Sequence, residues 1–600
     1  MLTLYKLILA ALVLSSTATH AVFGQTSPAT APEAATLRQT KPLWRFNTFA
    51  VATAHPLASE AGAAIIRQGG SAIDAAIAAQ MVLGLVEPQS SGLGGGGFLV
   101  YSKGSSVMAY DGRETAPAAT SPDLFMQTTE NGQKQPMAFT QAMVGGRAVG
   151  VPGLLAMLHL AHQDHGRLAW PELFLPAIRL AEQGFPVGQR LHSLLARDKY
   201  LRLDAEAGRY FYNPQGDPWP VAHLLKNPAL ADLLRGIARD GPTFFYQGSV
   251  AEAISQSVQS HQTNPGMLTA KDMGSYQALR RQPICFDWQP ENTKRLQVCG
   301  SPPPSSGTIA IGQILGMLAQ RPDLETPEQR DHAYLEAARL AFADRDHYIA
   351  DPDFIEPPAG TWQSLLRPEY LQERAALVTE KSLNRAHHGI PRDHKNRQIS
   401  LGSMQAQPES GTTHISVIDP QGNALALTSS IESAFGARRM VHGILLNNQL
   451  TDFSFRTEDT QGRPIANRPA PGKRPRSSMS PTLVFDGAIQ QPIASLGSAG
   501  GALIIHYVSH ALRGVFANRL SVQDSLDQPM FGSLNGPSLI EQDRFPPARA
   551  AALRLRGAEV RSIPMTSGTQ MLLREGNVII GGADARREGW VSGDYTARHD

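Results

Sequence analysis

The sequence has little of what metal sites and nucleic-acid-binding proteins need. It contains only two cysteines among 600 residues, and neither is spaced with histidines as zinc ligands are. Basic and acidic residues nearly balance, at 54 and 52, and no basic stretch is interleaved with aromatic residues. We therefore expect no metal, no cofactor and no nucleic-acid partner.

A long apolar run is also missing. The run LILAALVL at residues 7–14 follows Lys6 and leads into small residues that end at Ala21. A membrane span needs about 20 apolar residues, so this run is too short for an anchor, and no later segment is long enough. The pattern is typical of a secretory signal peptide at residues 1–21, with no membrane span after its removal. In a bacterium the product would be periplasmic or secreted.

The two cysteines lie beside strand-like runs, RQPICFDW around Cys285 and RLQVCGS around Cys299. The residues between these runs are turn-like. Export to an oxidising compartment would allow a cross-strand disulfide between the two cysteines. The alternative that the sequence leaves open is a pair of reduced, buried thiols.

Internal repeats and long low-complexity segments are absent as well, whereas apolar residues are plentiful. Hydrophobic residues make up 42% of the chain and charged residues 18%, which supports a large buried core. Residues 22–45 are rich in Ala, Thr, Ser and Pro and predict a mobile leader. Helices are expected at 56–67, which ends before a Gly pair, and at 72–85, which is apolar nearly all round and should be buried.

The middle of the chain, from about residue 171 to 374, is predicted to be mainly helical. A helical period runs through residues 338–354 (ARLAFADRDHYIADPDF). The polar residues Asp344, Asp346 and His347 are expected at a solvated or capping helix end, because no further ligand is spaced to complete a metal site.

A polar run separates this helical half from a strand-rich half. Residues 379–411 contain few large apolar side chains and no sustained period, which predicts a linker. Two strands joined by the turn Asp419–Gly422 are expected within residues 413–430. Three further strands and a helix follow, at 442–448, 481–487, 491–497 and 502–519. Strands flanked by helices indicate an α+β layered fold.

The polar run ends at Gly411, and two threonines follow. A threonine hydroxyl is a good nucleophile only when a base lies beside it, and the α-amine of an N-terminal threonine can be that base. Cleavage of the Gly411–Thr412 bond would free such an amine, and glycine permits the strained backbone that intramolecular attack requires. Thr413 would point to the opposite face of the strand, so only Thr412 is expected to act. These residues alone leave open that Thr412 simply opens a strand.

Several long motifs support the catalytic interpretation. In the first half they are GGSAIDAAIA (69–78), PQSSGLGGGGF (88–98), GRETAP (112–117), PPPSSG (302–307) and RLAFADR (339–345). In the second half they are GTTHISVID (411–419), LLNNQLTDFS (445–454), KRPRSSMSPT (473–482) and GSAGG (497–501). In this order, over almost the whole mature chain, they resemble the γ-glutamyltransferase (γ-glutamyl transpeptidase) family of N-terminal-nucleophile hydrolases. The resemblance implies a four-layer αββα sandwich.

The resemblance also implies a self-cleaving enzyme. Thr412 would attack the Gly411 carbonyl, which would divide the precursor into a large subunit, residues 46–411, and a small subunit, residues 412–600, held together as a heterodimer. The same hydroxyl would then take the γ-glutamyl group of glutathione or a similar compound. Water, an amino acid or a peptide would accept that group.

The resemblance assigns the donor carboxylate and the reacting carbonyl to separate residues. Arg113 would clamp the donor α-carboxylate with its planar guanidinium, and Ser477 and Ser478 would hydrogen-bond the same group. Gly500 and Gly501 would form an oxyanion hole from backbone N–H groups. If these residues had only structural roles, Arg113 would form an ion pair with a neighbouring acid. The serines would then cap a loop, and the glycines would form a helix-entry turn.

Three further residues are implied to hold the donor α-ammonium, and a fourth to assist processing. Gln449, Asp452 and Glu432 match the ammonium positions, and Ser430 matches a hydroxyl near the nucleophile. If they had only structural roles, Gln449 and Asp452 would belong to an Asn-rich turn, and Ser430 would end a strand. Glu432 is a departure, since many family members have Asn there and others Glu.

Two other departures concern the loops around the site. The segment at residues 435–448 is shorter than in many members of that family. Residues 453–475 contain no Tyr or Trp that could gate the pocket, as a lid does in some members. Two alternatives remain beside a γ-glutamyltransferase. A cephalosporin (glutaryl) acylase of the same superfamily would need no ammonium site, and a non-catalytic exported binding protein would need no nucleophile.

Overall fold

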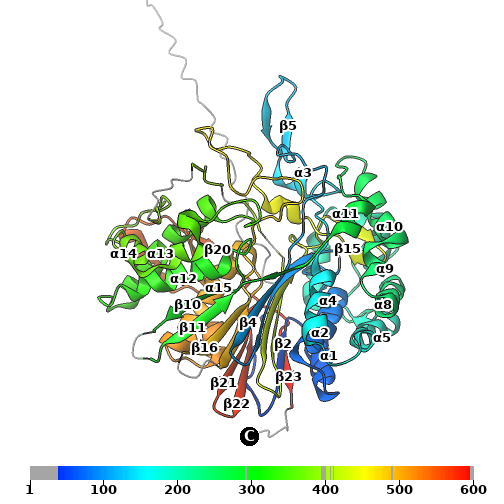
Figure 1. Cartoon of the computed structure of the whole chain (residues 1–600), viewed down its shortest axis with the longest axis horizontal. Helices are drawn as coiled ribbons and strands as arrows, with labels where there is room; N and C mark the ends of the chain where they lie inside the picture. Colours follow the sequence, from blue (N-terminus) through cyan, green and yellow to red (C-terminus); the bar gives the residue numbers. More distant parts are fainter. Residues whose placement is uncertain are drawn as a thin grey trace, which may run out of the picture.

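Two antiparallel sheets of seven strands each lie face to face at the centre of the molecule (Figure 1). The structure is a computed structural model, and it describes residues 38–290, 293–392, 400–405, 407–409, 411–487 and 491–594. The expected signal peptide and most of the expected leader lie outside these residues. Strand β1 already begins at Trp44, inside the segment that the composition assigned to the leader.

The strands of both sheets come from distant parts of the chain. The first sheet has the order β1 (Trp44–Phe46), β22 (Val578–Ala583), β21 (Gln570–Glu575), β17 (Pro492–Gly497), β16 (Thr482–Asp486), β11 (Leu296–Gly300) and β10 (Ile284–Trp288). The second has the order β23 (Trp590–Gly593), β2 (Ala50–Thr53), β12 (Thr413–Ile418), β13 (Ala424–Ser430), β3 (Gly96–Lys103), β4 (Ser106–Gly112) and β9 (Leu279–Arg281).

Helices cover the outer face of each sheet and complete four layers (Figure 1). The second sheet packs against α1 (Pro56–Arg67), α2 (Ala72–Val86), α4 (Leu154–His165), α5 (Leu175–Gln183), α8 (Pro228–Asp240) and α10 (Gly248–Gln259). The first packs against α12 (Gly307–Ala319), α13 (Pro327–Tyr348), α15 (Ile504–Leu512), α16 (Val522–Asp527) and α17 (Pro547–Leu555). The expected αββα sandwich of α+β class is confirmed.

Shorter elements connect and extend these layers. The remaining helices are α3 (Phe139–Met143), α6 (Gln189–Arg197), α7 (Ala205–Phe211), α9 (Thr243–Tyr246), α11 (Ala270–Ser275) and α14 (Pro368–Ala375). The remaining strands are β5 (Met126–Thr128), β6 (Lys134–Pro136), β7 (Phe185–Pro186), β8 (Leu224–Leu225), β14 (Met440–Val441), β15 (Ile444–Leu445), β18 (Phe531–Gly532), β19 (Ser538–Glu541) and β20 (Val560–Ile563).

Strand β13 shows how the sequence fits between a helix layer and a second sheet. Leu425 and Leu427 belong to the core under the helices, whereas Ala424 and Ala426 belong to the core between the sheets. Side chains alternate between the faces of a strand, so small residues on one face let the sheets approach and large ones on the other fill the helix layer. Strands β12 and β13 are buried at every position, which gives the residues at their ends a rigid mount.

One expectation for the long helix α13 is wrong. Asp344, Asp346 and His347 are not solvated, since they are 1%, 9% and 2% exposed. Asp344 accepts hydrogen bonds from Gln313, Tyr370 and Arg374, and Asp346 is paired with Arg476 at 3.1 Å. These partners come from distant segments, so helical periodicity could not reveal them. Among the described residues, no group of three or more His, Cys, Asp or Glu side chains is arranged to hold a metal ion.

The described parts of the polar run contact the folded core at specific points. The Ser382 N–H donates to the Arg556 carbonyl at 2.8 Å, and the Ala386 N–H donates to Asn535 Oδ1 at 2.7 Å. Further along, the N–H groups of Gly402 and Met404 each donate to a carbonyl at 2.9 Å. The run therefore lies against the sandwich in these parts, although its composition is that of a linker.

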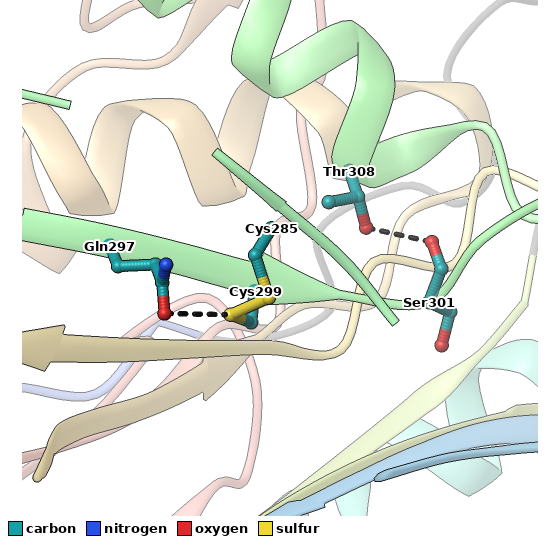
Figure 2. Close-up of a disulfide and its surroundings, with 5 residues drawn as sticks. All are labelled: Cys285, Gln297, Cys299, Ser301 and Thr308. Atoms are coloured by element: carbon teal, nitrogen blue, oxygen red, sulfur yellow. Dashed lines mark hydrogen bonds between the residues drawn. A yellow bond between two sulfur atoms is a disulfide. The ribbon is translucent and has the colours of Figure 1, made fainter. Parts of the chain in front are cut away.

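Cys285 and Cys299 form a disulfide across the β10–β11 hairpin (Figure 2). The two residues are direct partners in the ladder, and their Cα atoms are 4.1 Å apart. Just beyond β11, Thr308 Oγ1 at the start of α12 donates to the Ser301 carbonyl at 2.8 Å (Figure 2). The hairpin thus leads directly into the PPPSSG motif. None of the helices in the described ranges has the length and apolar character of a membrane span.

Candidate active site

Thr412 lies immediately before β12, near the middle of the second sheet. Its side chain is buried at 3% exposure, and its φ is +136°. A β-branched residue at positive φ is strained, because its Cβ crowds the backbone, and such strain costs on the order of 1–3 kcal/mol. Gly411 before it has φ +71°, which glycine adopts without this penalty. Thr412 is therefore strained at the predicted cleavage point.

A second hydroxyl faces Thr412. Ser430 ends β13, and Thr412 Oγ1 donates to Ser430 Oγ at a long 3.5 Å. Ser430 Oγ also accepts the backbone N–H of Glu432 at 2.8 Å, which fixes the orientation of the serine. The ends of two neighbouring strands thus place the Thr412 and Ser430 hydroxyls side by side.

An acidic cluster follows directly from this pair. Gln449 Nε2 donates to Glu432 Oε2 at 2.8 Å and to Asp452 Oδ2 at 3.0 Å. Within the described part of the chain, Gln449 Oε1 and Asp452 Oδ1 are buried without a hydrogen-bond donor. Burial raises the pKa of Asp452, against the pull of Arg113. Buried acceptors that lack donors suit a ligand with several N–H groups, such as an ammonium.

Arg113 connects this cluster to the serine pair. Its side chain is fully buried, and Nη2 donates to Asp452 and to the Arg476 carbonyl. Its Nη1 makes no hydrogen bond to any described residue, and the nearest acid on that side is Glu114 at 3.7 Å. Burial raises the pKa of Glu114 to about 8, although Arg113 opposes that shift. One edge of the guanidinium therefore has no hydrogen-bond acceptor among the described residues and suits a carboxylate ligand.

The serine pair lies beside a second buried arginine. Ser478 Oγ accepts Arg345 Nη2 at 2.6 Å, and the Ser477 carbonyl accepts the Ser306 hydroxyl at 2.8 Å. Arg345 Nη2 also donates to Glu409 Oε1 at 2.7 Å. Arg345 belongs to the motif RLAFADR, but sequence reasoning gave neither Arg345 nor Glu409 a role. A buried partner of the serines could have been suspected from the motif, whereas nothing in the sequence marks Glu409.

The two glycines form the turn into α15. Gly500 and Gly501 both have positive φ, at +126° and +58°, and Gly501 opens a short 3₁₀ turn at Gly501–Leu503. A Cβ on Gly501 would lie 1.9 Å from the Glu409 carbonyl oxygen, so the backbone before Thr412 runs directly over this turn. Contacts thus lead from Thr412 through the acids, Arg113 and the serines back to the glycines.

Another buried arginine, which the sequence did not single out, reaches Thr412. Arg587 Nη1 donates to the Thr412 carbonyl at 3.4 Å, and its other nitrogens donate to the Thr566 carbonyl. Arg587 lies near the end of the chain, in an Arg-Arg pair after β22. Its position between two carbonyls holds the start of β12 against the opposite sheet.

Known proteins resemble this chain over most of its length. The family model described as Gamma-glutamyltranspeptidase matches residues 58–594. A glutathione hydrolase proenzyme of Bacillus subtilis (strain 168) is 34% identical over 90% of this chain and 91% of its own length. A glutathione hydrolase proenzyme of Escherichia coli (strain K12) is 31% identical over 87% of each chain.

Solved structures show the same architecture. A cephalosporin acylase from Bacillus halodurans superposes with a TM-score of 0.78 at 25% identity, over 96% of this chain and 100% of that chain. A γ-glutamyltranspeptidase from Helicobacter pylori superposes with a TM-score of 0.50 at 30% identity, over 57% of this chain and 94% of that one. Together with the family match over most of the chain, these relatives show that the chain belongs to the γ-glutamyltranspeptidase family of enzymes.

Proposed function

We propose that the chain is an exported, self-cleaving γ-glutamyltransferase and glutathione hydrolase, which would be periplasmic or secreted. The family relationship supports γ-glutamyl chemistry, and the signal-like start of the sequence supports export. The observation that carries the proposal is the strained Thr412, buried beside Ser430 at the head of β12. A buried threonine in strain at that point is expected if the bond before it is to be broken.

Self-cleavage begins at this strained bond. Thr412 Oγ attacks the Gly411 carbonyl carbon, the C–N bond breaks, and the hydroxyl proton ends on the departing nitrogen. The product is an ester between Gly411 and the Thr412 oxygen, with a free α-amine on Thr412. Water then hydrolyses the ester, which leaves a carboxylate on Gly411 and restores the hydroxyl. Ser430 Oγ, 3.5 Å from Thr412 Oγ1, is placed to accept a hydrogen bond from the attacking hydroxyl.

The freed amine makes Thr412 a catalyst for donors. An α-amine titrates near pH 8, so near neutral pH a part of it is unprotonated and accepts the Thr412 hydroxyl proton. The oxygen attacks the γ-carbonyl of the donor, and the amine product leaves with the proton. The N–H groups of Gly500 and Gly501 support the oxyanion. Water, an amino acid or a peptide then attacks the γ-glutamyl ester and regenerates Thr412.

The donor is recognised by its two charged α-groups. Arg113, whose Nη1 has no hydrogen-bond acceptor among the described residues, takes the α-carboxylate together with the serines Ser477 and Ser478. Asp452 and Gln449 each have a buried oxygen that accepts no hydrogen bond from the described residues. Together with Glu432, they take the α-ammonium. A glutaryl donor has no α-ammonium, so this acidic cluster favours γ-glutamyl over glutaryl compounds and argues against an acylase specificity.

Self-cleavage is tested by the size of the purified protein. The wild type should run as two chains on a denaturing gel, and Thr412→Ala should remain one chain, because it lacks the attacking oxygen. N-terminal sequencing of the smaller chain should begin at Thr412. Wild-type protein that stays a single full-length band after prolonged incubation would contradict the proposal, as would a smaller chain that begins elsewhere.

Donor specificity is tested by removing one charge. In Asp452→Asn, kcat/KM for γ-glutamyl-p-nitroanilide should fall at least about tenfold, because a charge-assisted hydrogen bond to the ammonium is worth roughly 1.5–3 kcal/mol. Turnover of glutaryl-p-nitroanilide, which has no ammonium, should not fall with it. A parallel loss for both substrates would mean that Asp452 supports the fold of the site rather than the ammonium.

A further inference from the structure

The carboxylate of Glu409 lies beside Ser478, one of the residues expected to bind a substrate carboxylate. Its Oε1 lies 2.7 Å from Arg345 Nη2, and the same nitrogen donates to Ser478 Oγ at 2.6 Å. Only 11% of the Glu409 side chain and 4% of the Arg345 side chain are exposed. Burial alone would raise the pKa of Glu409, but the charges of Arg345 and Arg476 and the Ser478 hydroxyl hold it below the usual range. The Glu409 carboxylate is therefore ionised while it is paired with Arg345.

Arg345 is held in place by groups other than Glu409. Its Nε donates to Ser306 Oγ at 2.9 Å, and its Nη1 pairs with Asp346 at 3.1 Å. Its guanidinium also lies 5.3 Å from the centre of the Phe342 ring. An arginine fixed by several partners keeps its orientation when one of them leaves, so the site would persist as a carboxylate site without Glu409.

The backbone packs closely against its surroundings at Glu409 and at Gly411. The Glu409 carbonyl oxygen lies where a Cβ on Gly501 would come within 1.9 Å, so Glu409 fits only because Gly501 has no side chain. On the other side, a Cβ on Gly411 would lie 2.0 Å from the Glu432 carbonyl oxygen. The strained Thr412 follows directly. Glu409, held by its ion pair with Arg345, is two residues before Gly411 and the bond proposed to break.

We propose that Glu409 is a positioning residue for self-cleavage, and that Arg345 and Ser478 form the carboxylate site that holds it. Before cleavage the ion pair keeps the Gly411–Thr412 bond beside Ser430. After cleavage the tail ending at Gly411 must leave this site before a carboxylate of the substrate can use Ser478. The inference rests on the proposed function and adds Glu409 and Arg345 to its machinery. In the uncleaved chain, the Glu409 side chain then blocks the site formed by Arg345 and Ser478.

The test measures the rate of self-cleavage in the full-length chain made by cell-free synthesis, from the loss of the uncleaved band. Glu409→Ala and Glu409→Gln should each cleave at least about tenfold more slowly than wild type, because both lose a charge-assisted hydrogen bond. Acetate should accelerate Glu409→Ala, because a small carboxylate can enter the vacated Arg345 site. Sodium chloride at equal ionic strength should not. Arg345→Gln should be slow and insensitive to acetate.

A matched control is available on α13, the helix that carries Arg345. Glu336 is a buried carboxylate bound by Arg339 at 2.6 Å on α13, outside the cluster around Thr412. Glu336→Gln should cleave like wild type, which would separate the role of Glu409 from general loss of a buried ion pair. Wild-type rates in both Glu409 variants, or slow Glu409→Ala chains that acetate does not accelerate, would overturn the inference alone. A wild-type chain that never cleaves would overturn the proposed function as well.

Discussion

Gly411 shows how far the site depends on the absence of one side chain. Its φ of +71° and the 2.0 Å approach that a Cβ would make to the Glu432 carbonyl both require glycine. Gly422, in the turn between β12 and β13, has a similar φ of +81°, but a Cβ there would meet nothing within 4 Å. The two positions therefore separate backbone strain from contact within the site.

We predict that Gly411→Ala slows self-cleavage, because the new methyl group pushes the backbone away from Glu432 and moves the Gly411 carbonyl away from Thr412. Gly422→Ala should cleave at the wild-type rate and lose only about 1–2 kcal/mol of unfolding free energy, the cost of an alanine in the left-handed region. Band intensities over time and urea unfolding measure the two effects. Equal cleavage rates in both variants would rule out a role for the contact with Glu432.

Most residues of the proposed site could be named from the sequence because motifs carry them. Thr412, Arg113 and Asp452 stand in long motifs, and the structure brings them into one chain of contacts. Glu409 stands in no motif. Only its hydrogen bond from Arg345, which is far away in the sequence, indicates a role for its carboxylate. A partnership of this kind depends on tertiary distance, which neither composition nor periodicity contains.

At the scale of elements, local signals predicted what local interactions decide. The helix expected at 56–67 is found with those bounds, since Pro56 opens it and Gly69 and Gly70 follow its end. The strands on either side of the Asp419–Gly422 turn were also predicted, because strand preference and turn chemistry agree there. The paired cysteines follow from the same hairpin logic applied to β10 and β11.

Elements shaped by tertiary contacts were predicted less well. The strand expected at 442–448 is reduced to Ile444–Leu445, because Asn447 and Asn448 use their amides to bond loops around the site. The helix expected at 502–519 is divided into a 3₁₀ turn, α15 and a π-helical turn at Arg513–Ala517. Apolar periodicity identifies the buried face of such a segment but not changes in its winding.

At the scale of the whole molecule, the two proposed subunits share both sheets. In the second sheet, β2 from the first half of the chain lies between β23 and β12 from the second half, and β13 pairs with β3. In the first sheet, β1 pairs with β22 and β11 pairs with β16. Backbone hydrogen bonds therefore cross the subunit boundary at several places in each sheet.

This interleaving predicts that cleavage does not separate the subunits. Withdrawing one chain would break strand pairs in both sheets and expose the core between them, so it should cost as much as unfolding, roughly 5–15 kcal/mol. On native size-exclusion chromatography the cleaved protein should elute as one species at the volume of uncleaved Thr412→Ala. In increasing urea, separation of the chains and loss of circular dichroism should share one midpoint. A small subunit that elutes alone in buffer, or chains that separate well before structure is lost, would show that the shared sheets do not hold the two chains together.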